Sequence, residues 1–170
     1  MAPVGQTLLV TGPGVSTRFG ARGGRLSVSQ CAEDVPGEPT VLLVGTHDWA
    51  IEQSAAELEA AGCRVLRCHE PGEPTFPCNA LIEGRTCPLD VGFDVVATVR
   101  ARALSALTQP EFGVVCALHA GAPLVVAGVA SERPFGPWTA LTVEQDGDVV
   151  SACRTAVAET AANRSRQGAS

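Results

Sequence analysis

Short runs of apolar, β-favouring residues alternate along this chain with segments whose apolar residues recur at helical spacing. The run at 41–44 is continuous, and Ile51, Ala55 and Leu58 follow it at intervals of four and three. Unbroken apolar runs of this length are typical of strands buried on both faces, as in parallel sheets covered by helices. The alternation therefore predicts an α/β fold with right-handed crossovers.

The remaining elements follow the same pattern. Further strands are predicted at 64–68, 93–99, 124–127 and 139–143, and helices after Asp48, at 108–120 and at 148–163. Alternating polarity at 64–68 favours an edge strand. A turn at 146–147 would instead make 140–152 a hairpin, but a helical period that lasts three turns favours the strand followed by a helix.

The helix at 108–120 carries three agreeing start signals. Thr108 and Glu111 form a capping box, Leu107 and Phe112 a hydrophobic staple, and Pro110 stands in the first turn. The helix is apolar nearly all round, which predicts that it lies in the core, with Val115 and Leu118 buried.

The predicted architecture is a single three-layer parallel sheet of four to five strands. Its element order resembles the flavodoxin-like fold, and residues 41–62 resemble the first unit of a response-regulator receiver domain. A receiver carries an acidic pair after its first strand, a phosphorylated aspartate after its third and a later lysine. This chain has Thr46-His47-Asp48, then residues 99–102 reading VRAR, and no lysine. The resemblance implies a receiver-like scaffold without the phosphotransfer chemistry.

Composition predicts three regions. Residues 1–39 are rich in Gly, Pro, Ser and Thr and are expected to form a flexible N-terminal extension. The α/β domain is expected at 40–163, with a Cys- and Pro-rich loop at 69–92, and a disordered tail at 164–170.

Charge and cysteine content limit the function. The net charge of −6 argues against nucleic-acid binding, and the absence of lysine excludes Schiff-base chemistry. Seven cysteines, an odd number, and the absence of a basic start favour a cytoplasmic protein with reduced thiols. The uncharged stretch at 112–130 is interrupted by Gly and Pro, so no membrane interaction is expected.

A first candidate site lies where strands end. The first strand leads into Thr46, His47 and Asp48, and the third into Arg100 and Arg102. Ligands of open α/β sheets bind outside the carboxyl ends of strands where the strand order reverses, so these residues predict a site for a small anionic ligand. The alternative is that Asp48 caps a helix and the arginines are solvated strand ends.

A second candidate site is formed by Cys68, His69, Cys78 and Cys87. Thiolate and imidazole ligands suit zinc or an iron–sulfur cluster. A disulfide or redox pair among the three cysteines and simple packing remain alternatives. The other three cysteines of the domain are assigned to packing and are Cys63, Cys116 and Cys153.

These observations favour a non-catalytic, cytoplasmic regulatory domain that binds a protein partner or a small anionic ligand, with the Cys-rich loop as its distinctive surface. One alternative is a metal- or redox-sensing regulator. Another is an enzyme that acts on a small anionic substrate at the site of His47 and Arg100.

Overall fold

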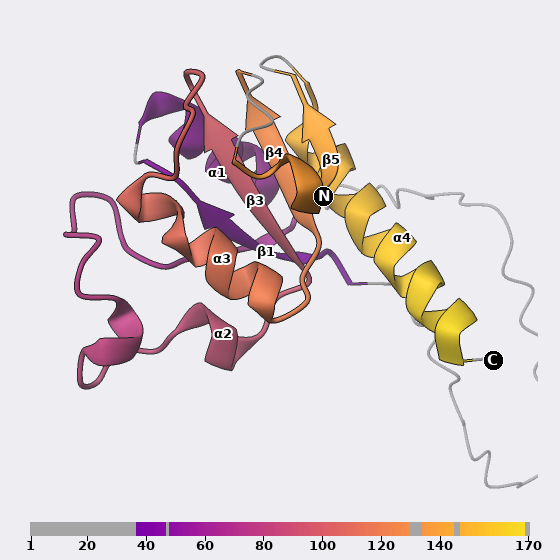
Figure 1. Ribbon diagram of the computed structural model, residues 1–170, viewed down its shortest axis with the longest axis horizontal. Helices are drawn as coiled ribbons and strands as arrows, with labels where there is room; N and C mark the ends of the chain where they lie inside the picture. The colour runs from indigo at the N-terminus through magenta and orange to yellow at the C-terminus, as the bar shows by residue number, and fades with distance from the viewer. Residues whose placement is uncertain (1–36, 47, 130–133, 145–146, 169–170) are drawn as a thin grey trace, which may run out of the picture. The chain divides into compact units, whose positions relative to one another are not determined.

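The computed structural model describes residues 37–46, 48–129, 134–144 and 147–168. Within them, a five-stranded, all-parallel sheet has the order β2-β1-β3-β4-β5. This order confirms the predicted α/β sheet of the flavodoxin-like type (Figure 1). The strands are β1 (Thr40–Val44), β2 (Arg64–Arg67), β3 (Val95–Arg100), β4 (Leu124–Gly128) and β5 (Thr139–Val143).

The described residues also form four α-helices and three 3₁₀ turns, of which the last helix follows β5 and the others lie between strands: α1 (Trp49–Ala60), η1 (Asn79–Leu81), α2 (Pro88–Val91), η2 (Gln109–Glu111), α3 (Phe112–His119), η3 (Gly136–Trp138) and α4 (Val149–Gly168). A helix follows β5, so the hairpin alternative is wrong. The helix also continues to Gly168, whereas the sequence predicted a disordered tail from 164. Residues 1–36 of the extension predicted at 1–39, together with His47 and residues 169–170, lie outside the described residues.

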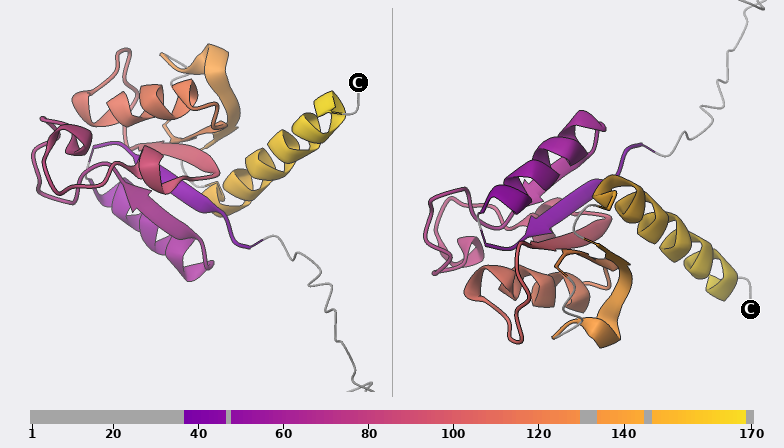
Figure 2. Two further views of the ribbon diagram at one scale, coloured as in Figure 1. Left: turned by 90° about the horizontal axis from the view of Figure 1, so that it is seen from below. Right: turned by 90° about the horizontal axis from the view of Figure 1, so that it is seen from above.

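Two apolar clusters lie on opposite faces of the sheet, because successive strand residues point to opposite sides. Val41 and Leu43 belong to one cluster, together with residues of α1 and α4. Leu42 and Val44 belong to the other, together with Val114 and other residues of α3 and its surroundings. Figure 2 shows α1 and α3 on opposite sides of the sheet.

Local signals account for the limits of α1. The Asp48 carboxylate accepts hydrogen bonds from the backbone N–H groups of Ala50 and Ile51, at 3.1 and 3.3 Å, and so caps the helix. Gly62 follows the helix with a φ of +88°, a conformation that glycine adopts without steric cost.

The connection from β2 to β3 contains only short elements. It holds η1 and α2, of three and four residues. Arg85 forms two hydrogen bonds with the Glu73 carboxylate, at 2.6 and 2.7 Å, and a third at 3.3 Å with Asn79 Oδ1. The Asn79 amide in turn donates to the carbonyl of Cys68. Polar contacts thus hold the Cys-rich loop together in place of a crossover helix.

The uncharged stretch at 112–130 forms α3 and β4 rather than one continuous helix. In the part of the chain that the structure describes, no helix combines the length and the apolar character that spanning a membrane requires.

The helix α3 offers a direct test of the packing. Val114 is fully buried, whereas Val115 is 48 % exposed, so the prediction that Val115 lies in the core is wrong. We expect Val114→Ala to lower the free energy of unfolding by about 2 kcal/mol, through lost apolar burial and a cavity. Val115→Ala should change it by less than about 0.5 kcal/mol. Urea denaturation measures both, and equal effects would contradict the placement of α3.

Candidate functional site

The residues predicted to bind an anion come from the point where the strand order reverses. Thr46 and Asp48 follow β1, and Arg100 and Arg102 lie at the end of the neighbouring β3. All four line one cavity of about 300 Å³, which we call the edge cavity. His47, the fifth predicted residue, lies outside the described residues.

Arg100 is already paired inside the protein. It is 3 % exposed, so the alternative of a solvated strand end is wrong for this residue. Its Nε donates to Glu111 Oε1 at 2.6 Å, and its Nη1 donates to the Leu104 carbonyl at 3.2 Å. The guanidinium carbon also lies 4.9 Å from the centre of the Phe135 ring. Its charge is balanced internally, which reduces what it offers to an anion.

The other charged residues of the edge cavity also offer an anion little net attraction. Asp48 is negative and is engaged as the helix cap, and Arg102 is exposed. Glu111 also lines the cavity, so its two arginines face two carboxylates. The structure brings the four described residues of this predicted site together. Anion binding there stays a prediction, and the two carboxylates that face the two arginines do not favour it.

Glu111 links the helix start to the sheet. One carboxylate oxygen, Oε2, accepts hydrogen bonds from the backbone N–H and the hydroxyl of Thr108, at 2.8 and 2.9 Å, which confirms the predicted capping box. The other oxygen accepts from Arg100 and, at 3.4 Å, from the Thr98 hydroxyl. A residue recognised as a local cap therefore also anchors α3 to the end of β3.

The four residues predicted to bind a metal line a second cavity, of about 200 Å³. Cys116, which the sequence analysis assigned to packing, lines it as well and lies on an exposed position of α3. We call this cavity the thiol pocket. Its thiols belong to Cys68, Cys78, Cys87 and Cys116.

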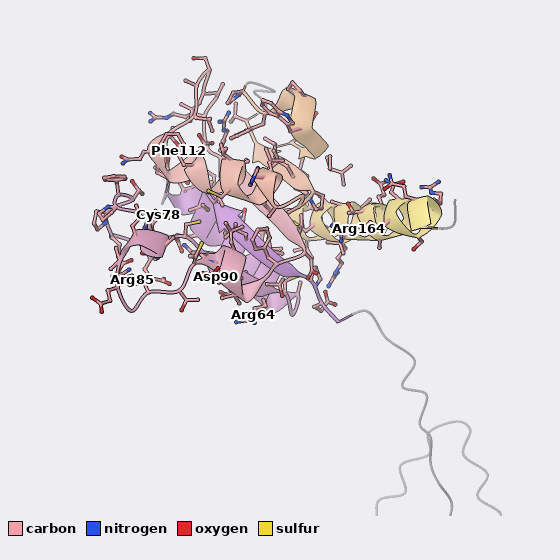
Figure 3. All side chains as sticks on the ribbon, turned by 60° about the horizontal axis from the view of Figure 1, so that its bottom comes forward. Arg64, Cys78, Arg85, Asp90, Phe112 and Arg164 are labelled. Atoms are coloured by element: carbon pink, nitrogen blue, oxygen red, sulfur yellow. The ribbon has the colours of Figure 1, made fainter. Side chains whose placement is uncertain are left out.

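Separate segments deliver these thiols. Cys68 directly follows β2, while Cys78 and Cys87 directly precede η1 and α2 in the loop. Cys116 lies on α3, which forms another part of the pocket lining. Figure 3 shows sulfur atoms gathered between the loop that carries Cys78 and the start of α3 at Phe112.

A glycine allows α3 to approach the end of β2. A Cβ atom added at Gly113 would lie 2.8 Å from the Cys68 sulfur and 3.2 Å from Val44 Cγ2. Phe112, Gly113 and Cys116 share one helix face and all line the thiol pocket. Their helical spacing is the signal by which sequence reasoning could have added Cys116 to the candidate ligands.

Burial favours the protonated form of two of these thiols, those of Cys68 and Cys116. Desolvation, followed by the proximity of the other three thiols, raises the pKa of Cys68 to about 12. Desolvation and the neighbouring loop thiols also raise the pKa of Cys116. A thiolate would therefore form here only if a positive charge compensated for the lost solvation, as a metal does.

All six cysteines of the described residues are free thiols, so the disulfide alternative finds no pair in this structure. Within the same residues, no group of three or more His, Cys, Asp or Glu side chains is arranged to hold a single metal ion. His69 lines the thiol pocket and is 9 % exposed.

No known protein family matches this chain, and no curated protein matches it either. The chemistry of the two cavities therefore carries the functional argument. The edge cavity holds charges that largely balance one another, whereas the thiol pocket holds four soft ligands with no structural partner among themselves. The thiol pocket is the stronger candidate site.

The buried pair of Arg100 and Glu111 yields a stability prediction. Both side chains are 2 % exposed. We expect Glu111→Ala to lower the free energy of unfolding by about 3–5 kcal/mol, because it leaves a buried guanidinium without its carboxylate. Arg100→Met combined with Glu111→Leu should cost less than the single change. Urea denaturation of the three proteins checks this, and a double variant less stable than the single one would contradict it.

Replacing Gly113 with alanine should change the stability of the protein in the direction opposite to the one that helix propensity predicts. Replacing an interior helix glycine with alanine ordinarily stabilises a helix by about 1 kcal/mol. We expect Gly113→Ala instead to destabilise the protein by about 1–3 kcal/mol, because the new methyl group meets the Cys68 sulfur. Gly168→Ala, which meets no atom within 4 Å, is the control and should be neutral. Thermal unfolding that shows stabilisation by Gly113→Ala would refute the close approach.

Proposed function

We propose that this chain is a non-catalytic regulatory domain that binds a thiophilic metal centre in the thiol pocket. One observation carries the proposal: four of the six described cysteines, three from the connection between β2 and β3 and one from α3, line the same cavity. Soft sulfur ligands prefer soft or borderline metals. A cytoplasmic location, where thiols stay reduced, fits this use of cysteine.

The regulatory role rests on where the pocket lies. Its loop has little regular structure and depends on few polar contacts, such as those of Arg85 with Glu73 and Asn79. A ligand that joins Cys78 and Cys87 to Cys68 and Cys116 would add cross-links to this loop. The order of the loop surface would then depend on occupancy, and a protein partner that binds one state of the loop would respond to the ligand.

The resemblance to a receiver that the sequence suggests would imply a regulatory role without phosphorylation. Asp94 lies at the amino end of the sheet, where its carboxylate accepts a hydrogen bond of 2.8 Å from the Thr40 N–H. The carboxyl end of β3 instead carries Arg100, buried against Glu111. The position that a receiver uses for its phosphoacceptor is thus occupied by an internal ion pair.

Trypsin provides a test, because every basic cleavage site in this chain is an arginine and Arg85 lies in the loop. Its side chain is 41 % exposed. We expect protein stripped of metal to be cut after Arg85 at least several-fold faster than protein loaded with zinc or with iron and sulfide, because the bound centre orders the loop. Mass spectrometry of the fragments measures the rates.

Two variants sharpen this test. Cys78→Ala should abolish the protection after Arg85, whereas Cys63→Ala, which alters a thiol outside the pocket, should preserve it. Equal cleavage rates in stripped and loaded protein, with no metal retained, would overturn the proposed function.

A further inference from the structure

The thiol pocket combines four sulfur ligands with a hollow interior. Its cavity of about 200 Å³ lies among the thiols of Cys68, Cys78, Cys87 and Cys116. Nevertheless, no three His, Cys, Asp or Glu side chains among the described residues stand close enough around one point to hold a single ion. These two observations together restrict the size of the ligand that fits.

A single ion requires a compact ligand set. With Zn–S bonds of about 2.3 Å in a tetrahedron, the four sulfur atoms lie about 3.8 Å from one another. The pocket would have to close around the ion to reach this geometry. The helix side is poorly placed to move, because Glu111 anchors the start of α3 to Arg100, and Gly113 already lies against the Cys68 sulfur.

A metal cluster needs a wider set of ligands than a single ion does. An iron–sulfur cluster is several ångströms across, so its cysteine ligands stand around a cavity, and the common [2Fe–2S] and [4Fe–4S] forms take four cysteines. We propose that the thiol pocket holds an iron–sulfur cluster ligated by Cys68, Cys78, Cys87 and Cys116. This inference rests on the proposed function and specifies its ligand. Transfer of a preformed cluster that carries four small-molecule thiolate ligands is a ligand exchange: four Fe–S bonds to those thiolates break, four Fe–Sγ bonds form, and the released thiolates take up the four cysteine protons without any change of oxidation state.

The lining of the pocket suits such a group. Phe76, Leu89, Pro110 and Phe112 contribute apolar side chains to its lining. Cys116 completes a set of four thiolates, so His69 is a neighbour of the cluster and not its ligand.

The experiment uses the full chain, purified without oxygen and also reconstituted with iron, sulfide and a thiol reductant. We expect iron and acid-labile sulfide in similar molar amounts on each chain, with sulfur-to-iron absorption in the visible spectrum. Chemical reduction should then produce or change an electron paramagnetic resonance signal. Cys116→Ala should lower the bound iron several-fold, while His69→Asn and Cys63→Ala should retain it.

The outcomes separate this inference from the proposed function. One zinc ion held by the four thiolates, without colour or sulfide, would overturn the cluster and leave the proposed function intact. Binding of neither zinc nor a cluster would overturn both. Loss of iron in His69→Asn but not in Cys116→Ala would overturn the assignment of the four ligands.

Discussion

The geometry of both cavities depends on the hydrogen bonds that the Glu111 carboxylate accepts. Its two oxygens hold Thr108 at the start of α3 and Arg100 at the end of β3. Both charged side chains are nearly inaccessible to water, so each needs the other to offset its desolvation. The pair therefore sets the position of α3 against the sheet. That position in turn brings Gly113 against Cys68 and turns Cys116 toward the Cys-rich loop.

The same pair changes the character of the carboxyl edge of the sheet. In a doubly wound sheet this edge is where ligands usually bind. Here the buried Arg100 meets Glu111 and the Phe135 ring, so the edge cavity opens onto groups that are already satisfied. The four thiols gather instead around the thiol pocket, beside a loop of short elements that replaces a crossover helix. The stronger candidate site of this parallel sheet therefore lies at the crossover loop and not at the strand ends.

Residues with a local role were predictable from the sequence. Asp48 caps α1 by accepting hydrogen bonds from the residues that follow it, and the capping box of Thr108 and Glu111 spans four consecutive residues. The strands were recognisable because continuous apolar runs follow directly from burial on both faces. Roles that depend on distant partners were not visible in the sequence. Arg100 was expected to bind an anion or to end a strand in solvent, and its burial against Glu111 was not foreseen. Val115 was wrongly expected in the core, because apolar character all round a helix does not reveal which side meets the sheet.

The sequence by itself determined the alternation of elements, the parallel sheet, the caps of its helices and the concentration of cysteines in one connection, because each depends on composition and short-range spacing. Only the tertiary structure decided that Glu111 would pair with Arg100, that α4 would extend to Gly168, and that Cys116 would join the three loop-side cysteines around one cavity. The physical reason is that these outcomes depend on how α3 packs across the sheet. That packing is set by desolvation of a charge pair and by the space left at Gly113, which no local pattern encodes.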